Sequence, residues 1–213
     1  MRKLDHWSPT YLRNRLMLAW DQKTNPMNPW LTNQATKLLN ELLQEGDVGF
    51  EWGSGRSTVW LAKRVSYLWS VESDLKWFDL VSKWLQTEKL ENVTYTFHSV
   101  EATEKSDLQH PYVQAINQIQ ECGLDFGLVD GKYRDACAVS LIPKLRPGGI
   151  LIVDNVERYL PSSSSSPESI GMNQNPSTKL WTEFADSVLN WRKIWTTNGV
   201  TDTCMWFKPC NLR

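Results

Sequence analysis

The chain has 213 residues and a formal net charge of −1, from 23 basic and 24 acidic side chains. This balance leaves no basic surplus for binding nucleic acid or an anionic membrane, so we expect neither as a partner. Hydrophobic residues make up 41% of the sequence, which is enough for a buried core, and the length suits a single α/β domain over residues 1–213.

The four cysteines are scattered and show no Cys-x-x-Cys spacing, which indicates free thiols rather than zinc ligands or a disulfide framework. The N-terminal region is locally basic but has no apolar stretch of signal-peptide length. No segment approaches the roughly 18 apolar residues that a membrane-spanning helix needs. We therefore expect a cytoplasmic protein.

In chain order, the sequence begins with an N-terminal helical segment over 1–30 and a helix over 32–46, with Thr32 as its cap and Gly46 as its end. Short apolar runs then alternate with helical patterns, which is typical of a parallel sheet covered on both faces. Strands are expected at 48–52, 66–72, 93–99, 124–130 and 148–155, and helices at 57–65, 73–89 (capped by Ser73), 110–123 and 134–145.

The last part of the chain changes character. Serine, proline and asparagine dominate 161–177, which predicts a flexible loop, either a tolerated surface insertion or a mobile lid. A helix over 178–191 follows, and Asn198-Gly199 between two β-rich runs predicts a hairpin. The expected fold is a three-layer α/β sandwich with a mostly parallel seven-stranded sheet and a C-terminal antiparallel hairpin.

Acidic residues end four of the predicted parallel strands. Glu51, Glu72, Asp130 and Asp154 are each the last or next-to-last residue of a strand. Right-handed crossovers bring the carboxyl ends of such strands to one edge, so these carboxylates should collect along one rim. Open α/β sheets bind their ligands at that edge.

The turn after the first strand carries the sequence G-S-G-R-S-T. Gly53 and Gly55 allow backbone to approach a ligand closely. A dinucleotide site would need a third glycine, where this chain has Thr58, and the nearby Glu51 suits a cationic group better than a pyrophosphate. An NAD(P)-dependent reductase is therefore the less favoured interpretation.

The run FEWGSGRST resembles motif I of class I S-adenosylmethionine-dependent methyltransferases, a Rossmann-like family. Glu72, nineteen residues after Gly53, is similar in position to the acid that binds the ribose hydroxyls in that family, and RPGGILIVDN and the hairpin also match. The resemblance extends over about residues 31 to 208. It implies a site for S-adenosylmethionine formed by Glu51, Gly53, Ser54, Gly55, Ser57, Thr58, Glu72, Ser73 and Glu101, the last of which is equally well interpreted as a surface residue.

Three polar residues after the fourth and fifth strands resemble the magnesium ligands of catechol and caffeoyl-coenzyme A O-methyltransferases: Asp130, Asp154 and Asn155. The match is incomplete, because those families have a lysine three residues after the first ligand and here Lys132 comes two residues after. The resemblance implies Mg²⁺ at this place. The alternative is that Asp130 contacts cofactor or substrate directly while Asp154-Asn155 shapes the turn. Asp130 or Lys132 is the expected proton acceptor.

The interpretation favoured by these residues is an S-adenosylmethionine-dependent methyltransferase that methylates a small molecule on oxygen. Three alternatives stay open: an N- or protein-methyltransferase, a non-catalytic S-adenosylmethionine-binding module, and the NAD(P)-dependent reductase. The sequence leaves the oligomeric state undetermined.

Overall fold

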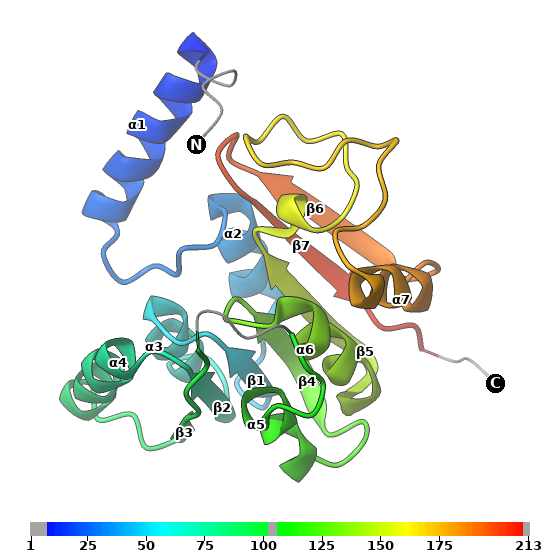
Figure 1. Ribbon diagram of the computed structural model, residues 1–213. Coiled ribbons are helices and arrows are strands. Elements are labelled where there is room, and N and C mark those ends of the chain that lie inside the picture. Colours follow the sequence, from blue (N-terminus) through cyan, green and yellow to red (C-terminus); the bar gives the residue numbers. More distant parts are fainter. Residues whose placement is uncertain (1–7, 102–105, 211–213) are drawn as a thin grey trace.

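A computed structural model describes residues 8–101 and 106–210 (Figure 1). Its centre is a seven-stranded sheet in the order β3-β2-β1-β4-β5-β7-β6. The strands are β1 (Val48–Trp52), β2 (Tyr67–Glu72), β3 (Val93–Phe97), β4 (Leu124–Val129), β5 (Leu145–Asp154), β6 (Arg192–Thr197) and β7 (Asp202–Phe207). The first five strands run parallel to one another, and β7 runs antiparallel to both β5 and β6, which confirms the predicted sheet.

The helices are α1 (Pro9–Thr24), α2 (Asn33–Leu42), α3 (Arg56–Ala62), α4 (Leu75–Thr87), α5 (Pro111–Gln114), α6 (Arg134–Leu141) and α7 (Lys179–Ser187), with short 3₁₀ helices η1 (Ala115–Gln118), η2 (Ile142–Lys144) and η3 (Val156–Arg158). Figure 1 shows α1 standing away from the sheet, and none of its residues is buried. No helix in the described part of the chain is long and apolar enough to cross a membrane.

Two hydrophobic cores make this a three-layer sandwich. On one face of the sheet, Ala35 and Leu39 of α2 and Leu61 of α3 pack against Leu68 and Ile152. On the other face, residues of α5, α6 and α7 pack against the opposite sides of the same strands. Trp52 belongs to this second core and is fully buried, with its indole N–H donating to the carbonyl of Tyr112 at 2.9 Å.

Several helices differ from the prediction in their bounds or caps. Helix α2 ends at Leu42 and not at Gly46, and α6 ends at Leu141 and continues as η2. The segment 110–123 holds one α-helical turn and one 3₁₀ turn, because the chain becomes extended at Ile119, although the expected apolar positions are buried. Helix α4 is capped by Asp74, whose Oδ1 accepts the Trp77 N–H at 2.9 Å, and not by Ser73. The Ser73 amide instead donates to Glu72, which moves the cap by one residue.

Candidate functional site

A cavity of about 420 Å³ opens at the carboxyl ends of β1, β2 and β4, where the topology predicted a ligand site. It is lined by six of the nine predicted cofactor residues, namely Gly53, Ser54, Gly55, Ser57, Glu72 and Ser73. Both predicted catalytic residues, Asp130 and Lys132, line it as well. A larger cavity of about 620 Å³ lies between α1, α2 and the hairpin turn, but it contains none of the residues that the motifs selected.

Gly53 lines this cavity at a point where the backbone leaves no space for a side chain. Its φ is +88°, and a Cβ at this position would lie 2.5 Å from the Gly131 nitrogen and 2.7 Å from the carbonyl carbon of Asp130. Such distances leave no space for a side chain, so glycine is required where the β1 turn contacts the β4 turn. The glycine therefore brings together two loops of the site in addition to exposing backbone to a ligand.

Glu51 and Thr58 support the glycine turn from beneath and do not line the cavity. The Glu51 carboxylate is fully buried and accepts hydrogen bonds from Thr58 Oγ1 at 2.6 Å and Ser70 Oγ at 2.7 Å. Thr58 Oγ1 in turn accepts the Gly55 amide at 3.0 Å. Burial raises the pKa of Glu51 to about 7. Thr58, which stands where a dinucleotide site would have its third glycine, thus connects the glycine turn to Glu51.

Glu72 joins the two loops on either side of the cavity. Its Oε2 accepts the amide of Ser54 at 2.9 Å and the Ser54 hydroxyl at 2.7 Å. Its Oε1 accepts the amides of Ser73 at 2.6 Å and Asp74 at 2.8 Å. The side chain is 4% exposed and lines the cavity. Its ribose-binding role stays a prediction, and a ribose hydroxyl that binds there has to share these oxygens with the four donors of the chain or displace one of them.

Arg134 occupies the position between β4 and β5 where a metal was expected. Its Nη2 donates to the carbonyl of Asp130 at 2.7 Å and forms an ion pair with Asp130 Oδ1 at 2.9 Å. Its Nη1 donates to the carbonyl of Asp154 and, at 3.3 Å, to the side-chain oxygen of Asn155. Its Nε donates to the carbonyl of Gly131 at 3.0 Å. The guanidinium therefore supplies the positive charge that these oxygens need.

The magnesium prediction is not supported by this arrangement. Asp154 is 3% exposed, and its Oδ1 accepts the Thr203 hydroxyl at 2.6 Å. Burial, first of all, and the neighbouring Asp130 carboxylate raise the pKa of Asp154. Asn155 has a φ of 50° and forms the turn after β5, and its side-chain oxygen already faces Arg134. The described residues hold no cluster of three metal-binding side chains.

Other predicted or missed residues are distributed around the rim. Glu101 lines a separate cavity of about 440 Å³, together with His98 and His110, and its role at the cofactor stays a prediction. Lys132 is exposed on the lining of the main cavity. The sequence interpretation did not assign Arg56, Asp74, Trp77 and Arg134, although all four line the cavity. Arg56 stood inside the glycine motif, but only the fold shows that its side chain reaches the cavity.

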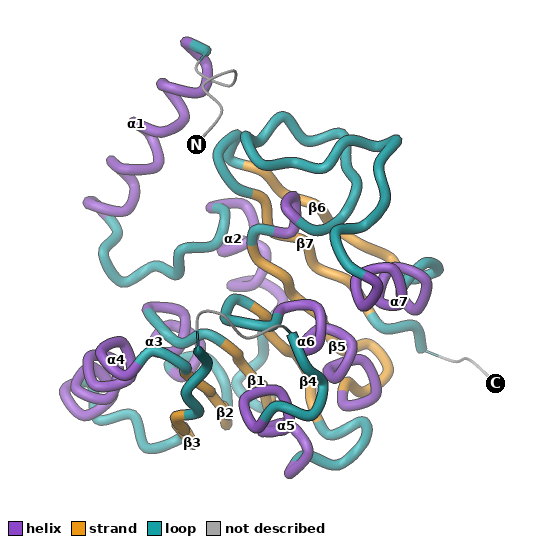
Figure 2. The backbone as a smooth tube through the Cα atoms, viewed as in Figure 1, coloured by secondary structure: helices purple, strands orange, loops and turns teal. Residues whose placement is uncertain are grey.

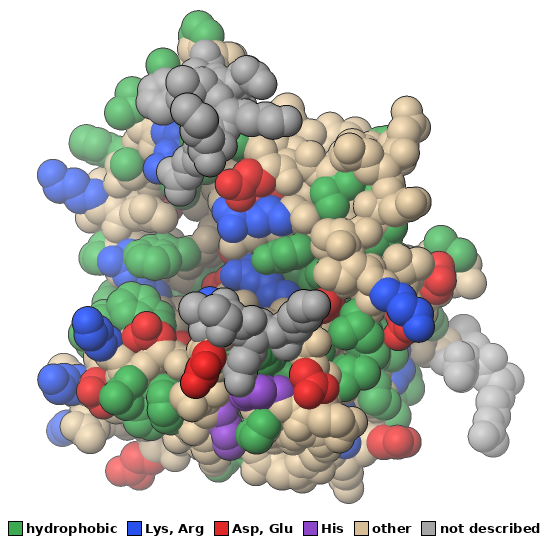
Figure 3. Space-filling model, viewed as in Figure 1, with side chains coloured by type: hydrophobic (Ala, Val, Ile, Leu, Met, Phe, Trp, Pro, Cys, Tyr) green, Lys and Arg blue, Asp and Glu red, His purple; other side chains and the backbone are tan. Residues whose placement is uncertain are grey.

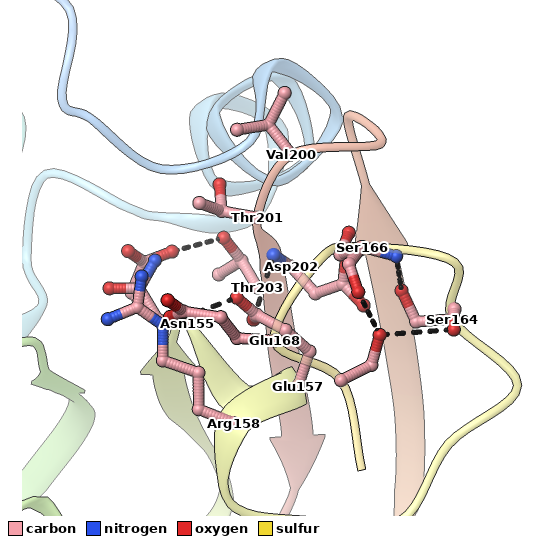
Figure 4. Close-up of polar contacts among 12 residues, drawn as sticks. Asn155, Glu157, Arg158, Ser164, Ser166, Glu168, Val200, Thr201, Asp202 and Thr203 are labelled. Carbon is pink, nitrogen blue, oxygen red and sulfur yellow. Dashed lines mark hydrogen bonds and ion pairs between the residues drawn. The ribbon is translucent and has the colours of Figure 1, made fainter. Parts of the chain in front are cut away.

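The serine-rich segment 161–177 contacts the β6–β7 hairpin and the turn after β5. Figure 2 shows it as a long loop next to the β6–β7 hairpin. In Figure 4, Ser166 points to Asp202 of β7, and its hydroxyl donates to the Asp202 carboxylate at 2.6 Å. The Asp202 amide donates to the buried Glu157 at 3.0 Å, and the carbonyl of Glu157 accepts the Ile170 amide at 2.8 Å. This segment thus forms hydrogen bonds with the rest of the fold; its flexibility, and its role as a surface insertion or as a lid, stay predictions.

No protein-family model and no curated protein matches this chain. Many solved structures share its fold, among them the following three. An rRNA methylase from Streptococcus thermophilus has a TM-score of 0.54 at 12% identity, over 83% of this chain and 95% of its own. A proposed methyltransferase of Streptococcus mutans, in complex with SAH, has a TM-score of 0.52 at 12% identity, over 82% of this chain and 96% of its own. The [4+2]-cyclase SpnF has a TM-score of 0.51 at 12% identity, over 84% of this chain and 81% of its own. The fold is therefore that of class I methyltransferases.

These neighbours correct one expectation. Because the chain has no basic surplus, we expected no nucleic-acid partner. That expectation is wrong, because the same fold is used by an rRNA methylase. Net charge averages over the whole surface, whereas an acceptor contacts one face. Figure 3 shows Lys and Arg side chains near the centre of the face that it presents, with Asp and Glu around them.

Proposed function

We propose that this protein binds S-adenosylmethionine in the cleft at the ends of β1, β2 and β4 and transfers its methyl group to an acceptor. The main support for this proposal is that residues from separate parts of the sequence meet at one cavity. The glycine turn, Glu72 and Asp130 are separated in sequence, they were selected by the motif pattern, and they line one cavity. Its volume of about 420 Å³ falls within the range of small-molecule sites, about 300–1,000 Å³.

The cofactor has three parts that differ in charge, and when bound it supplies an electrophilic methyl group on a positively charged sulfur. In our proposal the backbone of Gly53 and Gly55 contacts its amino acid end. Glu72 and Ser73 lie at the ribose, where a carboxylate can accept from two hydroxyls. The hydrogen bonds from Ser54 and Ser73 hold the Glu72 carboxylate in a fixed orientation before the ligand arrives.

We further propose oxygen of a small molecule as the acceptor atom, with Asp130 or Lys132 taking its proton. The Asp130 carboxylate is 27% exposed and is held at 2.9 Å from Arg134, so its orientation is fixed while one side stays accessible. Burial raises the pKa of Asp130, and the neighbouring guanidinium opposes that rise. A carboxylate with a raised pKa is the better proton acceptor near neutral pH.

The test is calorimetric titration of the purified chain with S-adenosylhomocysteine, and with NADH as the competing ligand. We expect binding of the first and none of the second. Glu72→Ala should weaken that binding by roughly 1.5–3 kcal/mol, the contribution of hydrogen bonds to a charged group. Glu91→Ala is the matched control, because it replaces a surface glutamate outside the cavity lining. Binding of NADH alone would overturn the proposal.

The acceptor is tested separately with S-adenosylmethionine carrying a radiolabelled methyl group. One arm offers a panel of hydroxylated small molecules, a second offers amines and peptides, and a third offers total RNA. Label transferred to a hydroxylated molecule supports oxygen methylation, and label on RNA or on nitrogen contradicts it. A fold neighbour is a cyclase, so binding without transfer in any arm would favour a module that holds the cofactor for another purpose.

A further inference from the structure

One wall of the cleft is formed by an arginine and two tryptophans from three separate segments. The Arg56 guanidinium carbon lies 5.1 Å from the centre of the Trp30 ring, within the range of a cation–π interaction. Trp30 in turn stacks on Trp77 of α4, with ring centres 6.1 Å apart. All three residues line the cavity, and we call them the aromatic wall. Trp30 fixes the guanidinium against this wall.

Arg56 has one side-chain donor that none of the described residues satisfies. Its Nη1 is buried and has no hydrogen-bond partner among the described residues. A buried N–H of a charged group without an acceptor is unfavourable, because it has lost its water without replacement. An arginine that lines a cavity and keeps an unused buried donor is therefore suited to an acceptor that enters the cavity.

The other cations of the cavity are placed differently. Arg134 already donates to Asp130, Gly131 and the turn after β5. Lys132 is exposed and follows the β4 turn, next to the predicted proton acceptor. Arg56 directly follows Gly55, so it lies beside the part of the cleft that our proposed function assigns to the amino acid end of the cofactor.

We propose that Arg56 binds the α-carboxylate of the amino acid end of S-adenosylmethionine, an inference that rests on the function proposed above. A guanidinium presents two parallel N–H groups that match the two oxygens of a carboxylate. Nη1 gains its missing acceptor on binding, and the contact with Trp30 already restricts the side chain, so that little freedom is lost. Arg56 thereby selects ligands that carry a carboxylate at this end.

The experiment compares two ligands that differ only in that carboxylate. Calorimetry measures the affinity of S-adenosylmethionine and of decarboxylated S-adenosylmethionine for the wild type and for Arg56→Gln. The wild type should prefer the carboxylated ligand by about 10- to 100-fold, the contribution of charge-assisted hydrogen bonds. Arg56→Gln should lose this preference while binding the decarboxylated ligand as the wild type does, which also shows that the variant is folded.

Three variants make the outcome specific. Arg56→Lys keeps the charge but loses the paired donors, so it should recover part of the preference. Arg64→Gln is the matched control, because Arg64 packs on Trp60 at 3.8 Å outside the cavity and should keep the full preference. Lys132→Gln tests the neighbouring cation and should also keep it.

Failure of the role proposed for Arg56 and failure of cofactor binding give different results in this experiment. A wild type that binds both ligands equally, or an Arg56→Gln variant that keeps the preference, overturns the role of Arg56 and leaves cofactor binding intact. Loss of the preference in Lys132→Gln instead of Arg56→Gln assigns the carboxylate to Lys132 and contradicts our inference. A wild type that binds neither ligand overturns the proposed function and this inference together.

Discussion

Replacing Gly53 with alanine tests the steric account of the site. Gly53 has a positive φ and no space for a Cβ, whereas Gly55 has neither restriction. At Gly53 the φ of +88° costs an L-residue about 1–2 kcal/mol. The new Cβ would also lie 2.5 Å from the Gly131 nitrogen, and overpacking of this kind costs about 1–3 kcal/mol. Gly53→Ala should therefore lower the free energy of unfolding by roughly 2–5 kcal/mol.

Gly55→Ala is the matched comparison. Gly55 has an extended φ of 171°, and a Cβ there would have Trp77 Nε1 as its nearest neighbour, at 3.7 Å. We expect its free energy of unfolding to change by less than about 1 kcal/mol, since any residue adopts this backbone. Its affinity for S-adenosylhomocysteine should nevertheless fall, because the methyl group projects into the cavity. Urea unfolding and calorimetry measure both quantities, and equal stability of the two variants would refute the reasoning.

Three further changes test the polar groups around the cleft. Glu72→Ala should lower the free energy of unfolding as well as ligand affinity, because it leaves the amides of Ser54 and Ser73 without their acceptor; an unchanged urea midpoint would contradict this. Arg134→Gln should lower the free energy of unfolding by about 3 kcal/mol through the broken ion pair, and in the wild type a chelator should leave S-adenosylhomocysteine binding unchanged in calorimetry. The pKa of Glu51, about 7 in the fold against an ordinary 4.5, means that the folded state binds this proton more tightly. The free energy of unfolding should therefore fall as pH rises through this interval, and Glu51→Gln should show a shallower fall in urea titrations at several pH values.

The sequence by itself determined the order of the elements and the edge at which they meet. Alternating apolar runs and helical periods predicted a parallel sheet, and crossover handedness then placed Glu72 and Asp130 on one rim. Asn198-Gly199 predicted the hairpin correctly, although the turn spans the four residues between Thr197 and Asp202 and not this pair alone. These features depend on local patterns, which a reader of the sequence can see directly.

Only the tertiary structure decided which motif residues line the cavity and which support the turn from beneath. The letters of the motif do not show that Glu51 lies beneath the turn while Arg56 lies in the cavity, because the direction of a side chain depends on the helix that follows. The expected metal site failed for a similar reason. Asp130 and Asn155 do come together, but the cation between them is Arg134, whose contacts with both strand ends exist only when the sheet has formed.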